Sequence, residues 1–294
     1  MGKVYDGIIG LVVGDALGVP YEFRQRDTFK ATGMAGYMTY NQQPGTWSDD
    51  SALTLATLES IGRRGRIDLA DIMSNFASWL ARGDFSARGD VFDVGTTTRA
   101  AIRKRIMYHI SPEQCGGTSE RDNGNGSLMR ILPLAFIKHS INDVYAVSSL
   151  THAHFLSRFA CEFYVDVATA LIDGCEIGAA IKQACFGGLP EEFKRLEFLS
   201  GLNRDQIKST GFVVHTLEAA LWCLLHTDNY KDCVLMAVNL GDDTDTVAAV
   251  AGGLAGIIYG VGGQNGIPEE WVDKIARHFW IKDLCEDFES KYSI

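Results

Sequence analysis

The sequence predicts an all-α fold, a compact single-domain bundle of ten or more helices. Apolar residues recur at helical spacing in several segments of the 294-residue chain. Long runs of alternating apolar and polar residues bounded by turn dipeptides, which would indicate strands, are missing from the sequence. Proline occurs only six times and no Pro- or Ser-rich tract resembles a linker, so residues 1–294 are expected to form one domain.

Helical periodicity places the individual elements. Leu55, Leu58 and Ile61 repeat at three-residue steps and predict a helix that begins at two aspartates. Ile72, Phe76, Trp79 and Leu80 fall on one face of a second helix. Segments rich in Ala, Leu and Val predict further helices over residues 155–172, 175–186, 212–226 and 229–240. The polar loops 24–48, 83–96 and 111–127 lead into helix starts, where sites are common.

One uncharged stretch, residues 247–268, is long enough to be mistaken for a membrane span. It is dense in glycine and follows directly on a run of aspartates. This pattern favours a buried helix whose small residues allow close packing. The N-terminal segment carries Asp6 and Asp15 around its apolar run and shows no clear cleavage site, so a signal peptide is not expected.

Charge and cysteine content limit the classes of partner and compartment. The net charge of -10 argues against nonspecific binding to nucleic acid or to an anionic membrane. The seven cysteines are widely spaced, odd in number and without a CxxC motif. This distribution predicts reduced thiols and a cytoplasmic protein.

Two acidic helix starts carry the strongest chemical signal. In the first, Ser48 precedes Asp49 and Asp50, and by itself this reads as a helix cap with acids complementing the dipole. The second places Asp243 and Asp245 among further acids and hydroxyls, more acceptors than capping requires. Clustered carboxylates raise one another's pKa unless a cation neutralises them. Two such clusters nearly 200 residues apart predict two walls of one site.

The ligand types select the metal. Carboxylate and hydroxyl oxygens are hard donors, which suit Mg²⁺, Mn²⁺ or Ca²⁺. His152 and His154 could form a zinc pair by composition, but they lack further ligands nearby in the sequence. The sequence therefore favours a hard divalent cation over zinc.

Six motifs in order resemble the ADP-ribosylglycohydrolases, a family that includes the dinitrogenase-reductase-activating glycohydrolase. They are GDALGVPYE, WSDDSAL, FDVGTTT, NGNGSLMRILPLA, THAH and GDDTDTVAAVAGGLAG, and they span almost the whole chain. The resemblance implies a compact all-α fold and a binuclear Mg²⁺ or Mn²⁺ centre. It also implies hydrolysis of the glycosidic bond between ADP-ribose and a protein side chain.

The resemblance assigns the metal ligands residue by residue: Ser48, Asp49, Asp50, Asp243, Asp245 and Thr246. Two positions depart from the family pattern. Ser48 replaces the usual Thr and preserves the hydroxyl. Asp242 stands where the family usually has Gly, which puts the local backbone shape in question.

The same resemblance suggests the catalytic and substrate-binding residues. Glu22, otherwise a solvated loop carboxylate, would hold or deprotonate water, while Asp49 and Asp245 would fix the metals for catalysis. Asp15 is expected to have a supporting, structural role. The expected substrate-binding residues are Asp93 at the ribose or leaving side chain, His152 in the ADP-ribose cleft, Gly124, Asn125, Gly126 and Ser127 at the diphosphate, and Met129 nearby.

The expected function is metal-dependent hydrolysis of an ADP-ribosylated protein, most readily at N-glycosidic ADP-ribosyl-arginine, with ADP-ribose as product. Asp93 and Asp90 would attract a cationic guanidinium leaving group. The alternatives are an enzyme for O-linked ADP-ribosyl-serine or another ADP-ribose conjugate, a metal-dependent phosphohydrolase, and a non-catalytic ADP-ribose-binding or structural family member. Since all six ligand positions keep oxygen donors, the enzyme is favoured.

Overall fold

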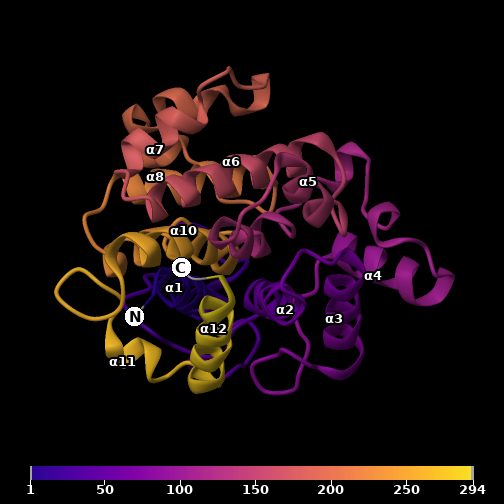
Figure 1. Ribbon diagram of the computed structural model, residues 1–294. Helices are drawn as coiled ribbons and strands as arrows, with labels where there is room; N and C mark the ends of the chain where they lie inside the picture. The colour runs from indigo at the N-terminus through magenta and orange to yellow at the C-terminus, as the bar shows by residue number, and fades with distance from the viewer. Residues whose placement is uncertain (1, 293–294) are drawn as a thin grey trace.

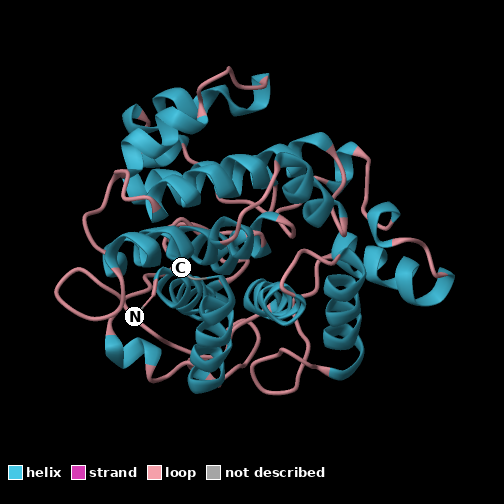
Figure 2. Ribbon diagram, in the orientation of Figure 1, coloured by secondary structure: helices cyan, strands magenta, loops and turns pink. Residues whose placement is uncertain are grey.

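The computed structural model describes residues 2–292, and within that range every regular element is helical (Figure 2). The predicted all-α fold is confirmed. The α-helices are α1 (Lys3–Gly18), α2 (Asp49–Arg64), α3 (Leu69–Arg82), α4 (Thr96–Tyr108), α5 (Ile141–Ser149), α6 (Phe155–Ile172), α7 (Ile177–Ala184), α8 (Val213–Leu225), α9 (Tyr230–Val238), α10 (Thr244–Tyr259), α11 (Glu269–Val272) and α12 (His278–Tyr292). The 3₁₀ helices are η1 (Val19–Tyr21), η2 (Pro112–Gln114), η3 (Glu120–Asp122), η4 (Leu128–Arg130), η5 (Leu132–Phe136), η6 (Glu191–Gly201) and η7 (Arg204–Gln206).

The predicted helices match α6, α7, α8 and α9 to within about two residues at each end. One expectation was wrong. The loop 111–127 was expected to lead into a helix start, but the apolar segment after it folds as two short 3₁₀ helices, η4 and η5. Pro133 lies at the start of η5 and cannot donate a backbone hydrogen bond, so a regular α-helix cannot run through this segment.

The core is built around the pair α1 and α10. A Cβ atom on Gly14 would lie 2.1 Å from the Ala248 carbonyl oxygen, and one on Gly18 would lie 2.3 Å from the Asp245 Cα. On the other helix, a Cβ on Gly256 would lie 2.2 Å from the Asp6 oxygen. The two helices therefore touch backbone to backbone, and the end of α1 is fixed against the start of α10.

The other helices surround this pair (Figure 1). Helices α6 and α8 cover α10 on one side, and α2 lies beside α1, with α3 and α12 packed against α2. Hydrogen bonds join the layers: the Tyr164 hydroxyl of α6 donates to the Val250 oxygen of α10 at 3.0 Å. The Tyr230 hydroxyl of α9 donates to the Gly10 oxygen of α1 at 2.6 Å. As a result, α10 is enclosed by protein on its sides.

The uncharged stretch at 247–268 forms most of α10 and the loop after it. Every residue of α10 from Thr244 to Ile257 is buried, as expected for a core helix. One helical segment, Lys3–Tyr21, is long and apolar enough to cross a membrane by length and composition, but 94% of its 18-residue apolar window is buried inside the fold. The burial of both segments is that of core helices.

Candidate active site between α2 and α10

The N-terminal ends of α2 and α10 meet in space. Asp50 Oδ2 accepts hydrogen bonds from the Ser48 hydroxyl at 3.0 Å and from the Thr246 hydroxyl at 3.3 Å. The Thr246 amide donates to Asp245 Oδ1 at 2.9 Å. The structure therefore brings the two acidic clusters of the sequence together, as expected for two walls of one site.

Asp15 of α1 binds the N-terminal end of α2. Its carboxylate accepts the Ser48 amide at 2.9 and 3.0 Å and the Ser51 amide at 3.0 Å, and it also accepts the Ser51 hydroxyl. Burial raises the pKa of Asp15 to about 6, although these hydrogen bonds favour the charged form. This is the supporting role that the sequence suggested, because Asp15 uses its oxygens to hold the start of α2.

The carboxylates at the meeting point are buried and incompletely satisfied. Asp50 Oδ1, Asp245 Oδ2 and Glu22 Oε2 are buried without a hydrogen-bond partner among the described residues. Burial and the neighbouring acids raise the pKa of Asp49, Asp50 and Asp245 well above the usual range. Buried carboxylates that repel one another and lack donors are stabilised either by protonation or by a cation, so the acidic clusters could bind metal.

Two groups of carboxylate oxygens have the spacing of metal sites. In one group, oxygens of Asp15, Asp50 and Asp245 lie within 4.8 Å of one another; in the other, those of Glu22, Asp243 and Asp245 do. Asp245 belongs to both groups, so it lies between the α2 side and the Glu22 side of the site. Asp49 contributes from the cleft wall.

A cleft of about 250 Å³ opens from the acidic cluster to the surface and is lined by most of the predicted substrate residues, namely Asp93, Gly124, Asn125, Gly126, Met129 and His152. Ser127 differs from them, because its hydroxyl is buried and bonded to Ser148 at 3.0 Å and to Cys161 at 3.4 Å. Its side chain therefore faces the core beneath the cleft. Ser127 can contribute to ligand binding only through its backbone.

Glu22 and Asp93 come from two loops, and both line this cleft. Tyr40 donates a hydrogen bond to Asp93 Oδ1 at 2.8 Å. Burial and the charge of Asp93 raise the pKa of Glu22 to about 10. Glu22 is thus a carboxyl group that is held neutral near pH 7 unless a cation or donor stabilises its charge.

Asn125 connects the glycine-containing loop to the start of α10. Its side-chain nitrogen donates to Asp243 Oδ2 and to the Thr216 hydroxyl, both at 2.9 Å. Its backbone amide is bonded to the Gly211 oxygen at 3.1 Å. Asn125 therefore fixes Asp243 as well as lining the cleft.

Asp242, the residue at a position where the family usually has Gly, is exposed and has a left-handed backbone with φ of 59°. Its amide donates to the Arg24 oxygen at 2.9 Å, and its oxygen accepts the Phe23 amide at 2.7 Å. Glycine adopts this conformation without strain and aspartate tolerates it better than most residues. The departure therefore leaves the local backbone intact and directs the additional carboxylate to solvent.

Sequence reasoning missed several residues that line or support the cleft. Phe23 lines the cleft, is 69% exposed and has φ of 63°. Tyr40 donates a hydrogen bond to Asp93, and residues 95–98 also line the cleft. Tyr40 lies in a long polar loop with no local pattern to single it out. The hydroxyl run Thr96–Thr98 in FDVGTTT was a usable signal, since only Asp93 was selected from that motif.

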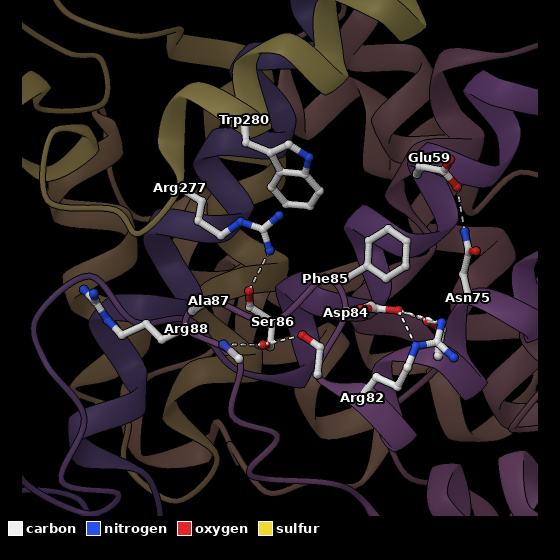
Figure 3. Close-up of a pocket in the computed structure, with 13 residues that line it drawn as sticks. Glu59, Asn75, Arg82, Asp84, Phe85, Ser86, Ala87, Arg88, Arg277 and Trp280 are labelled. Atoms are coloured by element: carbon white, nitrogen blue, oxygen red, sulfur yellow. Dashed lines mark hydrogen bonds and ion pairs between the residues drawn. The ribbon is translucent and has the colours of Figure 1, made fainter.

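A cavity of about 590 Å³ lies elsewhere, between α2, α3, α12 and the loop after α3 (Figure 3). Several of its charged groups are paired or stacked. Arg82 bonds Asp84 at 2.7 Å, and the Arg277 guanidinium lies 3.8 Å from the centre of the Trp280 ring and donates to the Ser86 oxygen. None of the predicted site residues lines this cavity.

Comparisons with known proteins identify relatives of the chain over almost its whole length. Residues 1–293 match the family model described as ADP-ribosylglycohydrolase. The chain is 34% identical to the ADP-ribosylarginine hydrolase Tri1 of Serratia proteamaculans (97% of this chain, 78% of the relative). It is also 34% identical to the ADP-ribosyl-[dinitrogen reductase] glycohydrolase of Rhodospirillum rubrum (93% of this chain, 90% of the relative). A solved structure titled ADP-ribosylglycohydrolase-related protein complex superposes with a TM-score of 0.84 at 26% identity, covering 99% of this chain and 98% of that one. The chain belongs to the ADP-ribosylglycohydrolase family.

Proposed function

We propose that this protein hydrolyses the N-glycosidic bond of ADP-ribosyl-arginine in modified proteins and releases ADP-ribose. The observation that carries the proposal is the junction of α2 and α10, where Asp50 accepts the Ser48 and Thr246 hydroxyls beside carboxylate oxygens without partners. Relatives 34% and 33% identical to this chain are named ADP-ribosylarginine hydrolases. The names of these relatives suggest the arginine linkage, and the acidic residues at the cleft suggest metal-dependent hydrolysis.

The donor set fits two hard divalent cations, Mg²⁺ or Mn²⁺. Ser48, Asp49, Asp50, Asp243, Asp245 and Thr246 would hold them. The unpartnered oxygens of Asp50 and Asp245 support this assignment, as do the two oxygen groups that share Asp245. Such ions, when present, would coordinate and polarise hydroxyl groups and water.

The chain's own residues would bind the substrate and move the proton. The amides of Gly124, Gly126 and Ser127 would hold the diphosphate, since the Asn125 amide is bonded to the Gly211 oxygen. His152 and Met129 would line the remainder of the cleft. Asp93, held by Tyr40, would face the ribose or the departing guanidinium. Glu22, ionised when cations occupy the acidic cluster, would take a proton from the attacking water, because it lines the cleft and its carboxylate also lies beside Asp243 and Asp245.

The carboxylates at the cleft favour arginine over serine as the linked side chain. A guanidinium leaving group is cationic and is attracted by acids such as Asp93, whereas a serine hydroxyl has no charge to attract. Asp90, which the sequence also suggested for this role, is exposed and does not line the cleft. The electrostatic preference is therefore assigned to Asp93 and the acids beside it.

The test is incubation of the protein with matched arginine-linked and serine-linked ADP-ribosyl peptides, with and without Mg²⁺ or Mn²⁺. Release of ADP-ribose from the arginine-linked peptide in the presence of metal is expected. Release of AMP would instead indicate a phosphohydrolase, and tight binding of ADP-ribose without turnover would indicate a binding module. Either result overturns the proposed activity.

The partners and compartment are part of the proposal. We propose an ADP-ribosylated protein as substrate, without a nucleic acid or membrane partner, in the cytoplasm. All seven cysteines are free thiols and five of them are buried, which supports a reducing compartment. The net charge of -10 would repel nucleic acids and anionic membranes.

A further inference from the structure

Arg130 is a buried cation with no acidic partner among residues 2–292. Its side chain is fully enclosed beneath the cleft. Nη2 donates to the Thr151 hydroxyl at 2.8 Å and to the Val147 oxygen at 3.2 Å, while Nε and Nη1 have no partner among the described residues. The guanidinium stacks on the Phe76 ring, 4.7 Å from its centre. Burying an unpaired charge is costly, so the few groups that contact the Arg130 guanidinium are strongly affected by it.

The Thr151 hydroxyl connects this cation to His152. Thr151 Oγ1 lies 2.8 Å from Arg130 Nη2 and 2.8 Å from His152 Nδ1. A guanidinium can only donate, so the Thr151 oxygen accepts from Arg130. The hydroxyl hydrogen then needs an acceptor in a fully buried position, and His152 Nδ1 is its one neighbour of that kind among the described residues. Nδ1 therefore accepts, and the ring hydrogen is carried by Nε2.

The edge of the ring that carries Nε2 faces the glycine-containing loop at the cleft. A Cβ on Gly124 would lie 3.4 Å from Nε2, and a Cβ on Gly126 would lie 2.8 Å from Cε1 of the same ring. His152 itself lines the cleft together with these two glycines. The glycines leave room for the ring edge, which brings an N–H donor to the loop assigned to the diphosphate.

The ring is also kept neutral. Burial and the charge of Arg130 lower the pKa of His152 to about 3. A neutral imidazole has one donor and one acceptor nitrogen, so fixing Nδ1 as the acceptor fixes the function of Nε2. The hydrogen-bond geometry and the electrostatics therefore select the same form of the ring.

We propose that Arg130 and Thr151 are positioning residues that hold His152 as the Nε2–H tautomer, so that it donates a hydrogen bond to an anionic oxygen of bound ADP-ribose. The inference rests on the proposed function for the identity of the ligand. The tautomer itself is a property of the free protein. Thr151 transmits the orientation, and Arg130 supplies the donor that fixes the direction of the Thr151 hydroxyl.

The matched variants are Thr151→Val, which removes the hydroxyl at nearly constant shape, and Thr151→Ser, which retains it. Protein labelled with ¹⁵N-histidine reports which ring nitrogen carries the proton, and His152→Gln identifies the His152 signals. The wild type and Thr151→Ser are expected to show Nε2–H. In Thr151→Val, the Nδ1–H form should become populated, and ADP-ribose affinity measured by calorimetry should fall about 10-fold.

The wild-type spectrum decides the proposal even if Thr151→Val does not fold. A proton on Nδ1 of His152 in the wild type overturns it. So does a folded Thr151→Val protein whose ring signals match the wild type, whatever its affinity, because Thr151 would then have only a structural role. If the ring shows Nε2–H but ADP-ribose does not bind, the positioning holds and the proposed function fails.

Discussion

The Thr246 hydroxyl at the start of α10 donates a hydrogen bond to Asp50 Oδ2 at the start of α2, across 196 positions of sequence. The same oxygen accepts the Ser48 hydroxyl, so both acceptor directions of Asp50 Oδ2 are used within the cluster. Asp50 Oδ1 remains without a partner among the described residues. A single carboxylate thus joins the two walls with one oxygen and presents the other to the site.

Metal binding should depend on the acids at this junction. Asp49→Ala or Asp245→Ala is expected to lower both Mn²⁺ affinity and kcat/KM by at least about 100-fold, because each removes a hard ligand from a small set. Calorimetric titration with Mn²⁺ and initial rates measure the two effects, and circular dichroism checks that the helices remain. Asp90→Ala, at an exposed position outside the cleft, is the control. Parent-like metal affinity and rate in both site variants would remove these residues from the ligand set.

Glu22→Gln should keep ADP-ribose binding and lose most of the rate. The amide has nearly the same shape but cannot take a proton, and general acid–base groups contribute on the order of 10²–10⁴-fold. Kd for ADP-ribose and kcat on an arginine-linked peptide separate the two effects. Glu192→Gln changes an exposed glutamate and serves as the control. Unchanged kcat in Glu22→Gln would exclude Glu22 from the chemistry.

Asp93→Asn should reduce turnover of arginine-linked peptides more than that of serine-linked peptides. The substitution removes a negative charge that faces the cleft, and a contact with a charged group is worth on the order of 10-fold or more. The measurement is kcat/KM on both peptides, compared with Asp90→Asn. Equal losses on the two peptides would show that Asp93 does not select the guanidinium. Equal wild-type values, or a preference for serine, would overturn the arginine assignment itself.

The metal-free protein should lose stability as the pH rises from about 4 to about 6. The pKa of Asp15 is raised by burial to about 6, so over this range the folded protein keeps a proton that the unfolded chain releases. The stability associated with this proton is fully present below about pH 4 and falls by roughly 2–3 kcal/mol by pH 6. Urea denaturation in EDTA at several pH values measures the slope, which should be smaller in Asp15→Asn. The opposite slope in this window would contradict the burial of a protonated Asp15.

The close contact of α1 and α10 predicts contrasting effects of glycine substitution. Gly14→Ala places a Cβ 2.1 Å from the Ala248 oxygen and should cost about 3 kcal/mol or more, because backbone cannot move aside. Gly178→Ala in α7 meets no atom within 4 Å and should stabilise the protein by about 0.5–1 kcal/mol. Denaturant titration of the two variants compares them directly. A neutral Gly14→Ala would show that the two helices are farther apart than described.

Local sequence was sufficient to predict a helix wherever one face of that helix had to be apolar. The pattern over residues 155–172 matches the bounds of α6, and the two acidic helix starts contained their own ligand types. Local sequence was insufficient to predict side-chain positions that depend on contacts between distant loops. Nothing local links Tyr40 with Asp93, and nothing near Ser127 shows that its hydroxyl faces Ser148 and the core. Side-chain direction in irregular segments is decided by tertiary packing, which a single sequence does not display.

The pairing of α1 with α10 also has a consequence for the order in which the chain is made. Helix α1 leaves the ribosome more than 200 residues before α10, on the order of tens of seconds earlier at common rates of synthesis. During that interval its apolar surface and glycine contact face have no native partner. A chaperone that shields residues 3–18 until α10 emerges would therefore raise the yield of active protein, and nascent chains that stop before residue 243 would lack Asp243, Asp245 and Thr246.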